Sequence, residues 1–252
     1  MTPDTARWWL EVASSGRRRH SNIGHARPIV LALVLVLALL TLSYKTPVTK
    51  EPRDILAYTV RIFAKEEGVV RPFGTGTVIG HATYEVGGDR VTHSLVLTNE
   101  HVVRGREEIT TYSRGVPFGG TVVSVDPDRD LALVEVRGTL PKAPLYFGPL
   151  EPGEREVIVG DPFGHGLLIT EGFVGNAISG VRAGSASAYP GNSGGGLYVD
   201  RADRYVLAGV VGTIQKYPNG LFSVSLASTV HFAVPMEKVR EFLREHGVLA
   251  EE

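Results

Sequence analysis

Cysteine is absent from the 252-residue chain. Its absence excludes a disulfide framework and a thiol nucleophile, but it leaves the cellular compartment open, because many exported proteins also lack cysteine. A strong charge of either sign is missing as well, since the formal net charge is −1. Together with 43% hydrophobic residues, this balance argues against a nucleic-acid-binding protein and against a disordered chain. The sequence therefore predicts a folded protein with a sizeable core.

Helical periodicity is scarce in most of the chain. Glycine is abundant, at 30 residues, and short runs rich in valine, isoleucine and threonine alternate with turn residues, a pattern typical of β-structure. Residues 86–90 suit the tip of a hairpin. Only the end is typical of a helix, which begins at Pro235 and stops at Gly247. We expect two small β-barrels closed by a C-terminal helix. The predicted strands cover residues 58–63, 76–80, 94–98, 108–112, 120–125, 131–136, 156–159, 172–175, 205–212 and 230–234.

One long hydrophobic run lies near the amino end. Residues 28–44 carry no charge, and about 17 residues is the lower limit for crossing a bilayer core of roughly 30 Å. Five arginines and only two acids precede the run, an arrangement that holds the amino end in the cytoplasm. A cleaved signal peptide is the alternative, but no Ala-x-Ala cleavage site follows. We favour an uncleaved transmembrane anchor.

These features predict four segments. Residues 1–27 would be a basic cytoplasmic segment, residues 28–44 a transmembrane helix, and residues 45–56 a proline-containing linker. Residues 57–252 would form the folded domain. The protein would then be a single-pass protein of the cell membrane with its domain outside the cytoplasm, or periplasmic or secreted if the anchor is cleaved.

The glycine-rich stretch around Ser193 is the strongest functional signal. The sequence Pro190-Gly-Asn-Ser193-Gly-Gly-Gly contains too many glycines for the interior of a helix or strand. Such a stretch lets the backbone bend sharply and direct successive N–H groups toward one point. A hydroxyl on that turn suits acyl transfer, which needs an oxygen nucleophile beside amide donors. An ordinary glycine-rich turn with an incidental serine is the alternative.

A serine nucleophile needs a histidine base that a carboxylate orients. Among eight histidines, His101 follows a predicted strand at the point where the chain leaves the core. Asp130 directly precedes the apolar run Leu-Ala-Leu-Val, so it can be partly buried, as an orienting acid must be. Asp126 and Asp128 flank a proline and are interpreted as solvated turn residues.

In their order along the chain, Thr98-Asn-Glu-His101, Asp130-Leu-Ala-Leu and Gly191-Asn-Ser193-Gly-Gly resemble the chymotrypsin-like serine proteases. The nearest branch is Deg/HtrA, because residues 74–79, 159–164 and 232–235 also resemble its motifs. The resemblance covers residues 57–247 and implies an all-β fold of two six-stranded antiparallel β-barrels with a C-terminal helix.

The same resemblance implies a serine endopeptidase, with a role in protein quality control or processing. Ser193 would attack the peptide carbonyl, His101 would transfer the proton, and Asp130 would orient the imidazole. The N–H groups of Gly191 and Ser193 would form the oxyanion hole. Substrates would be proteins or peptides, and neither a cofactor nor a metal is implied. Nothing in the sequence indicates an oligomer.

The resemblance also assigns a substrate pocket. It contains no acid at its base, so we expect a small or medium apolar side chain before the scissile bond rather than arginine or lysine. The residues expected to line it are Ser187, Ala188, Gly212, Thr213 and Ile214.

Two departures from the family pattern matter. Asn192 stands where digestive members carry an aspartate that pairs with a new amino terminus, so activation by zymogen cleavage has no physical basis here. Regulation would instead act by ordering the loops around residues 164–170 and 183–189. Deg/HtrA proteins usually continue into a PDZ domain, whereas we expect none after the helix here and do not assume peptide recognition by such a module. A catalytically silent binding or structural barrel and an esterase with the same triad are the competing hypotheses.

Overall fold

A computed structural model describes residues 52–250 except 107, 179, 203 and 213–229. The chain divides into two units, Met1–Thr49 and Lys50–Glu252, and the described residues all belong to the second. The predicted cytoplasmic segment and transmembrane helix lie outside the described residues. Within the described part of the chain, no helix has the length and apolar character needed to cross a membrane.

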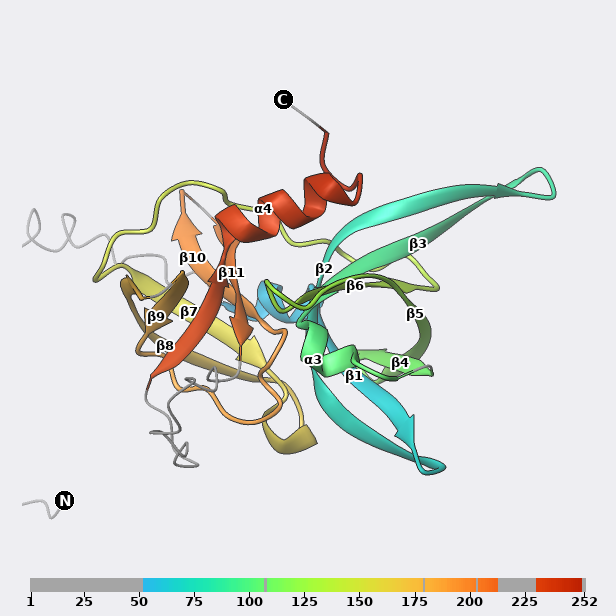
Figure 1. Ribbon diagram of the computed structural model, residues 1–252, viewed down its shortest axis with the longest axis horizontal. Coiled ribbons are helices and arrows are strands. Elements are labelled where there is room, and N and C mark those ends of the chain that lie inside the picture. Colours follow the sequence, from blue (N-terminus) through green and yellow to red (C-terminus); the bar gives the residue numbers. More distant parts are fainter. Residues whose placement is uncertain (1–51, 107, 179, 203, 213–229, 251–252) are drawn as a thin grey trace, which may run out of the picture. The chain divides into compact units, whose positions relative to one another are not determined.

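Twelve antiparallel strands form two six-stranded sheets, and each sheet closes on itself as a barrel (Figure 1). The strand order is β1-β2-β3-β6-β5-β4 in the first barrel and β10-β11-β12-β9-β8-β7 in the second. The first barrel consists of β1 (Thr59–Glu66), β2 (Val69–Val86), β3 (Asp89–Thr98), β4 (Ile109–Ser113), β5 (Val116–Asp126) and β6 (Leu131–Val136). The second consists of β7 (Arg155–Gly160), β8 (Leu168–Ile178), β9 (Val181–Gly184), β10 (Gly196–Arg201), β11 (Arg204–Gly212) and β12 (His231–Pro235).

Within the described residues, four helical segments accompany the strands. They are the 3-10 helices η1 (Pro52–Ala57) and η2 (Pro162–Gly164), and the α-helices α3 (Glu100–Val103) and α4 (Met236–Glu245). Helix α4 follows Pro235 directly and is succeeded by Gly247 at φ +68°, so the predicted C-terminal helix is confirmed. Its apolar face is fully buried at Val239, Phe242 and Leu243.

Side chains on the strands alternate between the barrel interior and the surface. Bulges in several strands let each six-stranded sheet close into a barrel. In β1 the burial alternates over most of its length, as expected when one face of a strand meets a barrel interior. Register shifts place extra residues in β2, β5, β8 and β11. Such bulges bend a strand, and bent strands let a six-stranded sheet close. Gly87 and Gly88, both at positive φ, make the predicted hairpin tip between β2 and β3.

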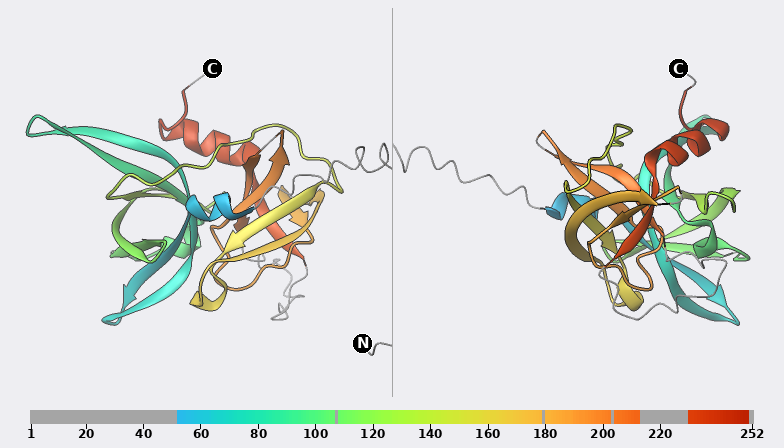
Figure 2. Two further views of the ribbon diagram at one scale, coloured as in Figure 1. Left: turned by 180° about the vertical axis from the view of Figure 1, so that it is seen from behind. Right: turned by 60° about the vertical axis from the view of Figure 1, so that its left-hand side comes forward.

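Each barrel has its own apolar interior, and a third cluster joins the barrels. This shared cluster contains Leu97 and Leu131 from the first barrel, Val157 and Tyr198 from the second, and the buried face of α4. Ile55 of η1 belongs to the same cluster and is fully buried. The segment before the first strand therefore packs into the domain, at the junction of the two barrels (Figure 2).

The structure corrects the length of one predicted strand and adds two strands. Strand β2 runs for 18 residues, whereas residues 76–80 alone were expected, so the β2–β3 hairpin projects far from the first barrel (Figure 1). Two strands were missed, β9 and β10. Strand β10 was missed because it begins at Gly196, within the glycine-rich stretch, where strand propensity is low.

Candidate active site

His101 and Asp130 meet because the strands that precede and follow them are neighbours. Strand β3 leads into α3, which carries His101, and Asp130 immediately precedes β6, the hydrogen-bonded partner of β3. The imidazole Nδ1 lies 2.9 Å from both carboxylate oxygens of Asp130. Asp130 is an acceptor when ionised, so the ring proton belongs on Nδ1 and Nε2 becomes the proton-accepting atom.

The backbone also holds the Asp130 carboxylate. The main-chain N–H of His101 donates to Oδ1 of Asp130 at 3.1 Å, and Asn99 Nδ2 donates to the Asp130 carbonyl at 2.9 Å. Asp130 has φ of +54°, a left-handed conformation that is uncommon for residues other than glycine and is best tolerated by asparagine and aspartate. The conformation directs the side chain back toward His101.

Asp126 has a different environment. Its Oδ1 accepts hydrogen bonds from the N–H groups of Asp128 and Arg129, and its Oδ2 accepts one from the Arg129 guanidinium at 2.6 Å. Asp126 therefore builds the turn, as expected, but it is an ion-paired turn residue rather than a solvated one. The Asp128 side chain is exposed.

The turn that carries Ser193 depends on its glycines. Gly191 has φ of +100° and Gly194 has φ of +82°. A Cβ on Gly191 would lie 2.1 Å from the Asp161 carbonyl oxygen, and one on Gly194 would lie 2.1 Å from the Thr75 carbonyl oxygen. Any side chain at either position would therefore displace the turn. Ser193 itself is 4% exposed.

Hydrogen bonds from the first barrel hold this turn in place. The Thr75 N–H donates to the Ser193 carbonyl at 2.8 Å, and the Thr75 hydroxyl donates to the Gly191 carbonyl at 2.7 Å. The same hydroxyl accepts the Asp161 N–H at 2.9 Å. A Cβ on Gly74 would lie 2.8 Å from both the Ser193 carbonyl oxygen and the side chain of Val102, the residue after His101. One stretch of β2 thus adjoins both the serine turn and the histidine helix.

An ion pair makes a further link between the barrels. Arg61 Nε donates to Oδ2 of the buried Asp161 at 2.7 Å, and Arg61 Nη2 donates to the Gly164 carbonyl. The Gly166 N–H donates to the other carboxylate oxygen of Asp161. Sequence reasoning missed Arg61, and it did not single out Thr75 or Asp161 within residues 74–79 and 159–164. Thr75 and Asp161 could have been found from these two motifs, which were already identified in the sequence.

The peptide between Pro190 and Gly191 determines where an oxyanion donor points. The Pro190 carbonyl accepts a hydrogen bond from the Phe163 N–H at 2.8 Å. In a trans peptide the C=O and the next N–H lie on opposite sides, so the Gly191 N–H points away from Phe163. Among the described residues, no group accepts a hydrogen bond from it. The Gly191 donor is therefore available for a ligand.

The predicted pocket residues are only partly described. Ser187 and Ala188 are half-buried just before the serine turn, and the Ser187 carbonyl accepts a hydrogen bond from the Thr170 hydroxyl at 2.7 Å. Gly212 ends β11, next to the site because the Gly194 N–H donates to the carbonyl of Val211. Thr213 and Ile214 lie outside the described residues.

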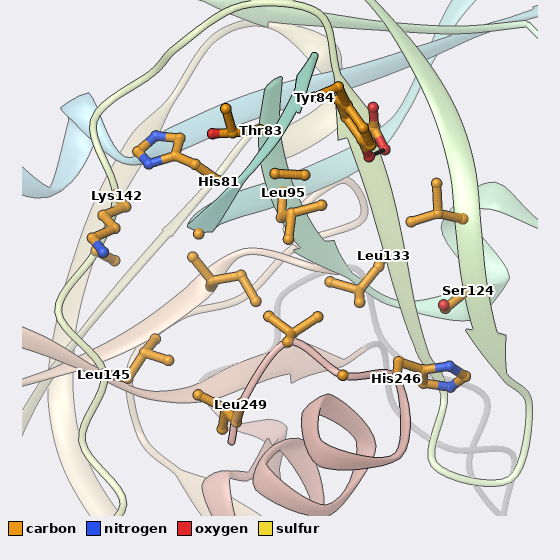
Figure 3. A pocket seen from close by; sticks show the side chains of 18 of the residues that line it. His81, Thr83, Tyr84, Leu95, Ser124, Leu133, Lys142, Leu145, His246 and Leu249 are labelled. Atoms are coloured by element: carbon orange, nitrogen blue, oxygen red, sulfur yellow. Dashed lines mark hydrogen bonds between the residues drawn. The ribbon is translucent and has the colours of Figure 1, made fainter. Parts of the chain in front are cut away.

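A separate cavity of about 910 Å³ lies between the β2–β3 hairpin and the segment that follows α4. Leu95, Leu133 and Leu249 line it, with His246 and Lys142 at its edge (Figure 3). None of His101, Asp130 and Ser193 lines this cavity. Within the described ranges, no group of three histidine, aspartate or glutamate side chains could hold a metal ion.

Comparison with known families agrees with this geometry. The family model described as a trypsin-like peptidase domain matches residues 74–208, a range that covers more than half of the chain and contains His101, Asp130 and Ser193. The chain belongs to the trypsin-like peptidase family. The suspected resemblance is confirmed.

Individual relatives of this trypsin-like peptidase are serine proteases. The serine protease Rv3671c of Mycobacterium tuberculosis is 40% identical over 90 residues, 35% of this chain and 22% of that protein. Serine protease HTRA1 of Xenopus tropicalis is 29% identical over 170 residues, 60% of this chain and 33% of that protein. The chain therefore spans a third or less of these relatives.

Solved structures show the same fold. The inactive form of the Rv3671c protease superimposes with a TM-score of 0.57 at 25% identity, covering 77% of this chain and 91% of that one. The HtrA-type protease AlgW, solved with a tripeptide, gives a TM-score of 0.60 at 25% identity, covering 76% of this chain and 62% of that one. The trypsin-like peptidase is thus related to both Rv3671c and the HtrA proteases.

Proposed function

We propose that this chain is a serine endopeptidase that uses Ser193, His101 and Asp130 as its catalytic triad. The observation that carries the proposal is the double contact of His101 Nδ1 with Asp130, at 2.9 Å to each oxygen, next to a serine turn anchored on the same stretch of β2. Labelling with a fluorophosphonate and digestion of a protein substrate test it, as argued in the Discussion.

In this mechanism His101 Nε2 accepts the proton of the Ser193 hydroxyl while the oxygen attacks the peptide carbonyl, forming a tetrahedral intermediate. The same proton then passes to the leaving amine as the C–N bond breaks, which leaves the acyl-enzyme. Asp130 keeps the ring in the required tautomer and stabilises its charged form. Water then attacks the acyl-enzyme. His101 accepts a proton from the water and passes it to the Ser193 oxygen as the acyl group leaves.

The oxyanion of the tetrahedral intermediate would bind the N–H groups of Gly191 and Ser193. The orientation of the Pro190–Gly191 peptide supports this role for Gly191, because its N–H points away from Phe163. Loss of one such donor typically costs about 3 kcal/mol of transition-state stabilisation. Asn192 in place of an aspartate supports a turn that forms without zymogen cleavage.

We expect the enzyme to select a small or medium apolar side chain before the scissile bond. The reason is the half-buried Ser187, which offers no charge to a basic side chain. A library of peptides that varies only this position measures the preference through kcat/KM. Alanine or valine should be favoured over arginine by at least about 10-fold, the equivalent of about 1.4 kcal/mol. A preference for arginine would contradict the assignment of Ser187 to the base of the substrate pocket.

We further propose that residues 28–44 anchor the enzyme in the cell membrane, with the protease domain outside the cytoplasm acting in quality control or processing of proteins there. The uncharged length of this run and the arginines before it support the proposal. Intact mass of the fluorophosphonate-labelled protein from membrane and soluble fractions tests it. We expect the full-length mass in the membrane fraction, and a shortened mass in the soluble fraction alone would contradict an uncleaved anchor.

A further inference from the structure

The second barrel buries an acid and a histidine that the proposed chemistry does not use. Glu156 lies in β7 and His231 begins β12, and both side chains are 0% exposed. The imidazole Nδ1 lies 3.6 Å from Oε1 of Glu156. Ionisable groups are seldom fully buried unless they are paired or perform a task, because removing them from water is costly.

Both groups bind the same residue, Ala186. Oε1 of Glu156 accepts the Ala186 N–H at 3.1 Å, and Nδ1 of His231 donates to the Ala186 carbonyl at 3.0 Å. Ala186 is itself fully buried. The two side chains therefore satisfy both backbone groups of a residue that lies outside any strand and has no ladder partner of its own.

Two glycines make room for this arrangement. A Cβ on Gly184 would lie 2.3 Å from Oε1 of Glu156 and 2.4 Å from Cε1 of His231. A Cβ on Gly172 would lie 2.1 Å from the Ala186 nitrogen. The backbone of β9 thus approaches the pair, and the backbone of β8 approaches Ala186, as closely as glycine allows, which leaves Ala186 little freedom to shift.

Charge balance explains why the acid and the histidine occur together. Burial raises the pKa of the Glu156 carboxyl, and the nearby His231 and the Ala186 N–H oppose that rise. Oε2 of Glu156 and Nε2 of His231 have no hydrogen-bond partner among the described residues. The site has no net charge when Glu156 and His231 are both neutral or when both are ionised. If only one of them were ionised, its charge would be buried without compensation.

Ala186 leads directly into Ser187 and Ala188, the predicted pocket residues. The serine turn beyond them has separate anchors, through Thr75 and through the hydrogen bond between Phe163 and Pro190. We propose that Glu156 and His231 are positioning residues that hold the wall of the substrate pocket through Ala186, independently of the triad and the oxyanion hole. The inference rests on the proposed function, because it concerns the pocket of that same enzyme.

The test uses the full chain and succinyl-Ala-Ala-Pro-Val p-nitroanilide as substrate. His231→Leu removes the donor to the Ala186 carbonyl, while His231→Asn keeps an N–H donor at nearly the same place. In His231→Leu the buried Ala186 carbonyl loses its hydrogen-bond donor. The pocket wall should then shift and KM should rise by about 10-fold. His231→Asn should restore KM to within about 3-fold of the wild type. The rate of labelling by a small fluorophosphonate, which does not fill the pocket, should change by less than about 2-fold in both variants.

His93→Leu is the matched control. His93 forms a partly exposed pair with Glu135, at 2.5 Å, in the first barrel away from Ala186, so its loss should leave KM unchanged. If His231→Leu does not fold, Gly184→Ala gives the same readout, because its methyl group would push against the pair.

An unchanged KM in a folded His231→Leu or Gly184→Ala variant would overturn the inference, and so would an equal rise in KM for His93→Leu. A fall in the labelling rate that matches the fall in peptide hydrolysis would overturn it as well, since it would mean that the triad itself had moved. Failure of the proposed function is distinguishable, because the wild type would then either not be labelled at all or be labelled without hydrolysing the peptide substrate.

Discussion

Replacing Ser193 with alanine is expected to abolish labelling by a fluorophosphonate and to lower kcat for casein digestion by about 10⁶-fold. The reason is the loss of the hydroxyl oxygen that forms the acyl-enzyme in the proposed mechanism, while the backbone hydrogen bonds of Ser193, Gly191 and Gly194 that hold the turn are retained. Intact mass reports the labelling, and fluorescence release from labelled casein reports the turnover.

Ser124→Ala is the control for the Ser193 variant. Ser124 lies on β5 in the first barrel and lines the separate cavity, so its loss should leave both readouts unchanged. A wild type that resists labelling would favour a catalytically silent barrel. Labelling that survives in Ser193→Ala would point to another nucleophile, and turnover of p-nitrophenyl esters without cleavage of casein would favour an esterase.

Asp130→Asn is expected to lower kcat by about 10⁴-fold, the loss that the equivalent change causes in the trypsin template. The amide oxygen would keep the hydrogen bond from the His101 main-chain N–H, so the NH₂ group would donate to His101 Nδ1. The ring proton would then lie on Nε2, which could no longer act as a base. The left-handed backbone at φ +54° suits asparagine as well as aspartate. We therefore expect the thermal unfolding temperature to shift by no more than a few degrees.

Kinetics with the valine p-nitroanilide measure the Asp130 effect, and Asp128→Asn provides the control. Asp128 has an exposed side chain two residues away, so its loss should leave kcat within about 2-fold of the wild type. A fall in kcat of less than about 10-fold in Asp130→Asn would remove Asp130 from the triad. A larger loss accompanied by unfolding would assign it a structural role.

Local patterns in the sequence were sufficient for the strand-rich fold class. Alternating runs predicted most strands, Gly87 and Gly88 predicted the hairpin tip, and Pro235 with Gly247 predicted the C-terminal helix. These signals lie within a few neighbouring residues, where propensity and spacing act directly. His101 and Asp130 each stand where a strand meets a turn, but the resemblance of three ordered motifs to a known family was needed to assign them.

Contacts between distant residues were decided only when the barrels closed. The Thr75 hydroxyl meets Gly191 and Asp161 across the two barrels, and Glu156 reaches His231 around the second barrel. No local pattern predicts such contacts, because strand register and barrel closure determine which side chains meet. The length of β2 and the presence of β10 also depend on contacts between distant residues. Hydrogen bonds to the neighbouring strands outweigh the low strand propensity of the glycines in these segments. The sequence thus supplied Ser193, His101 and Asp130 as candidates, while the closed fold brought His101 into contact with Asp130, set the direction of the Gly191 N–H and bound Ala186 to a buried pair.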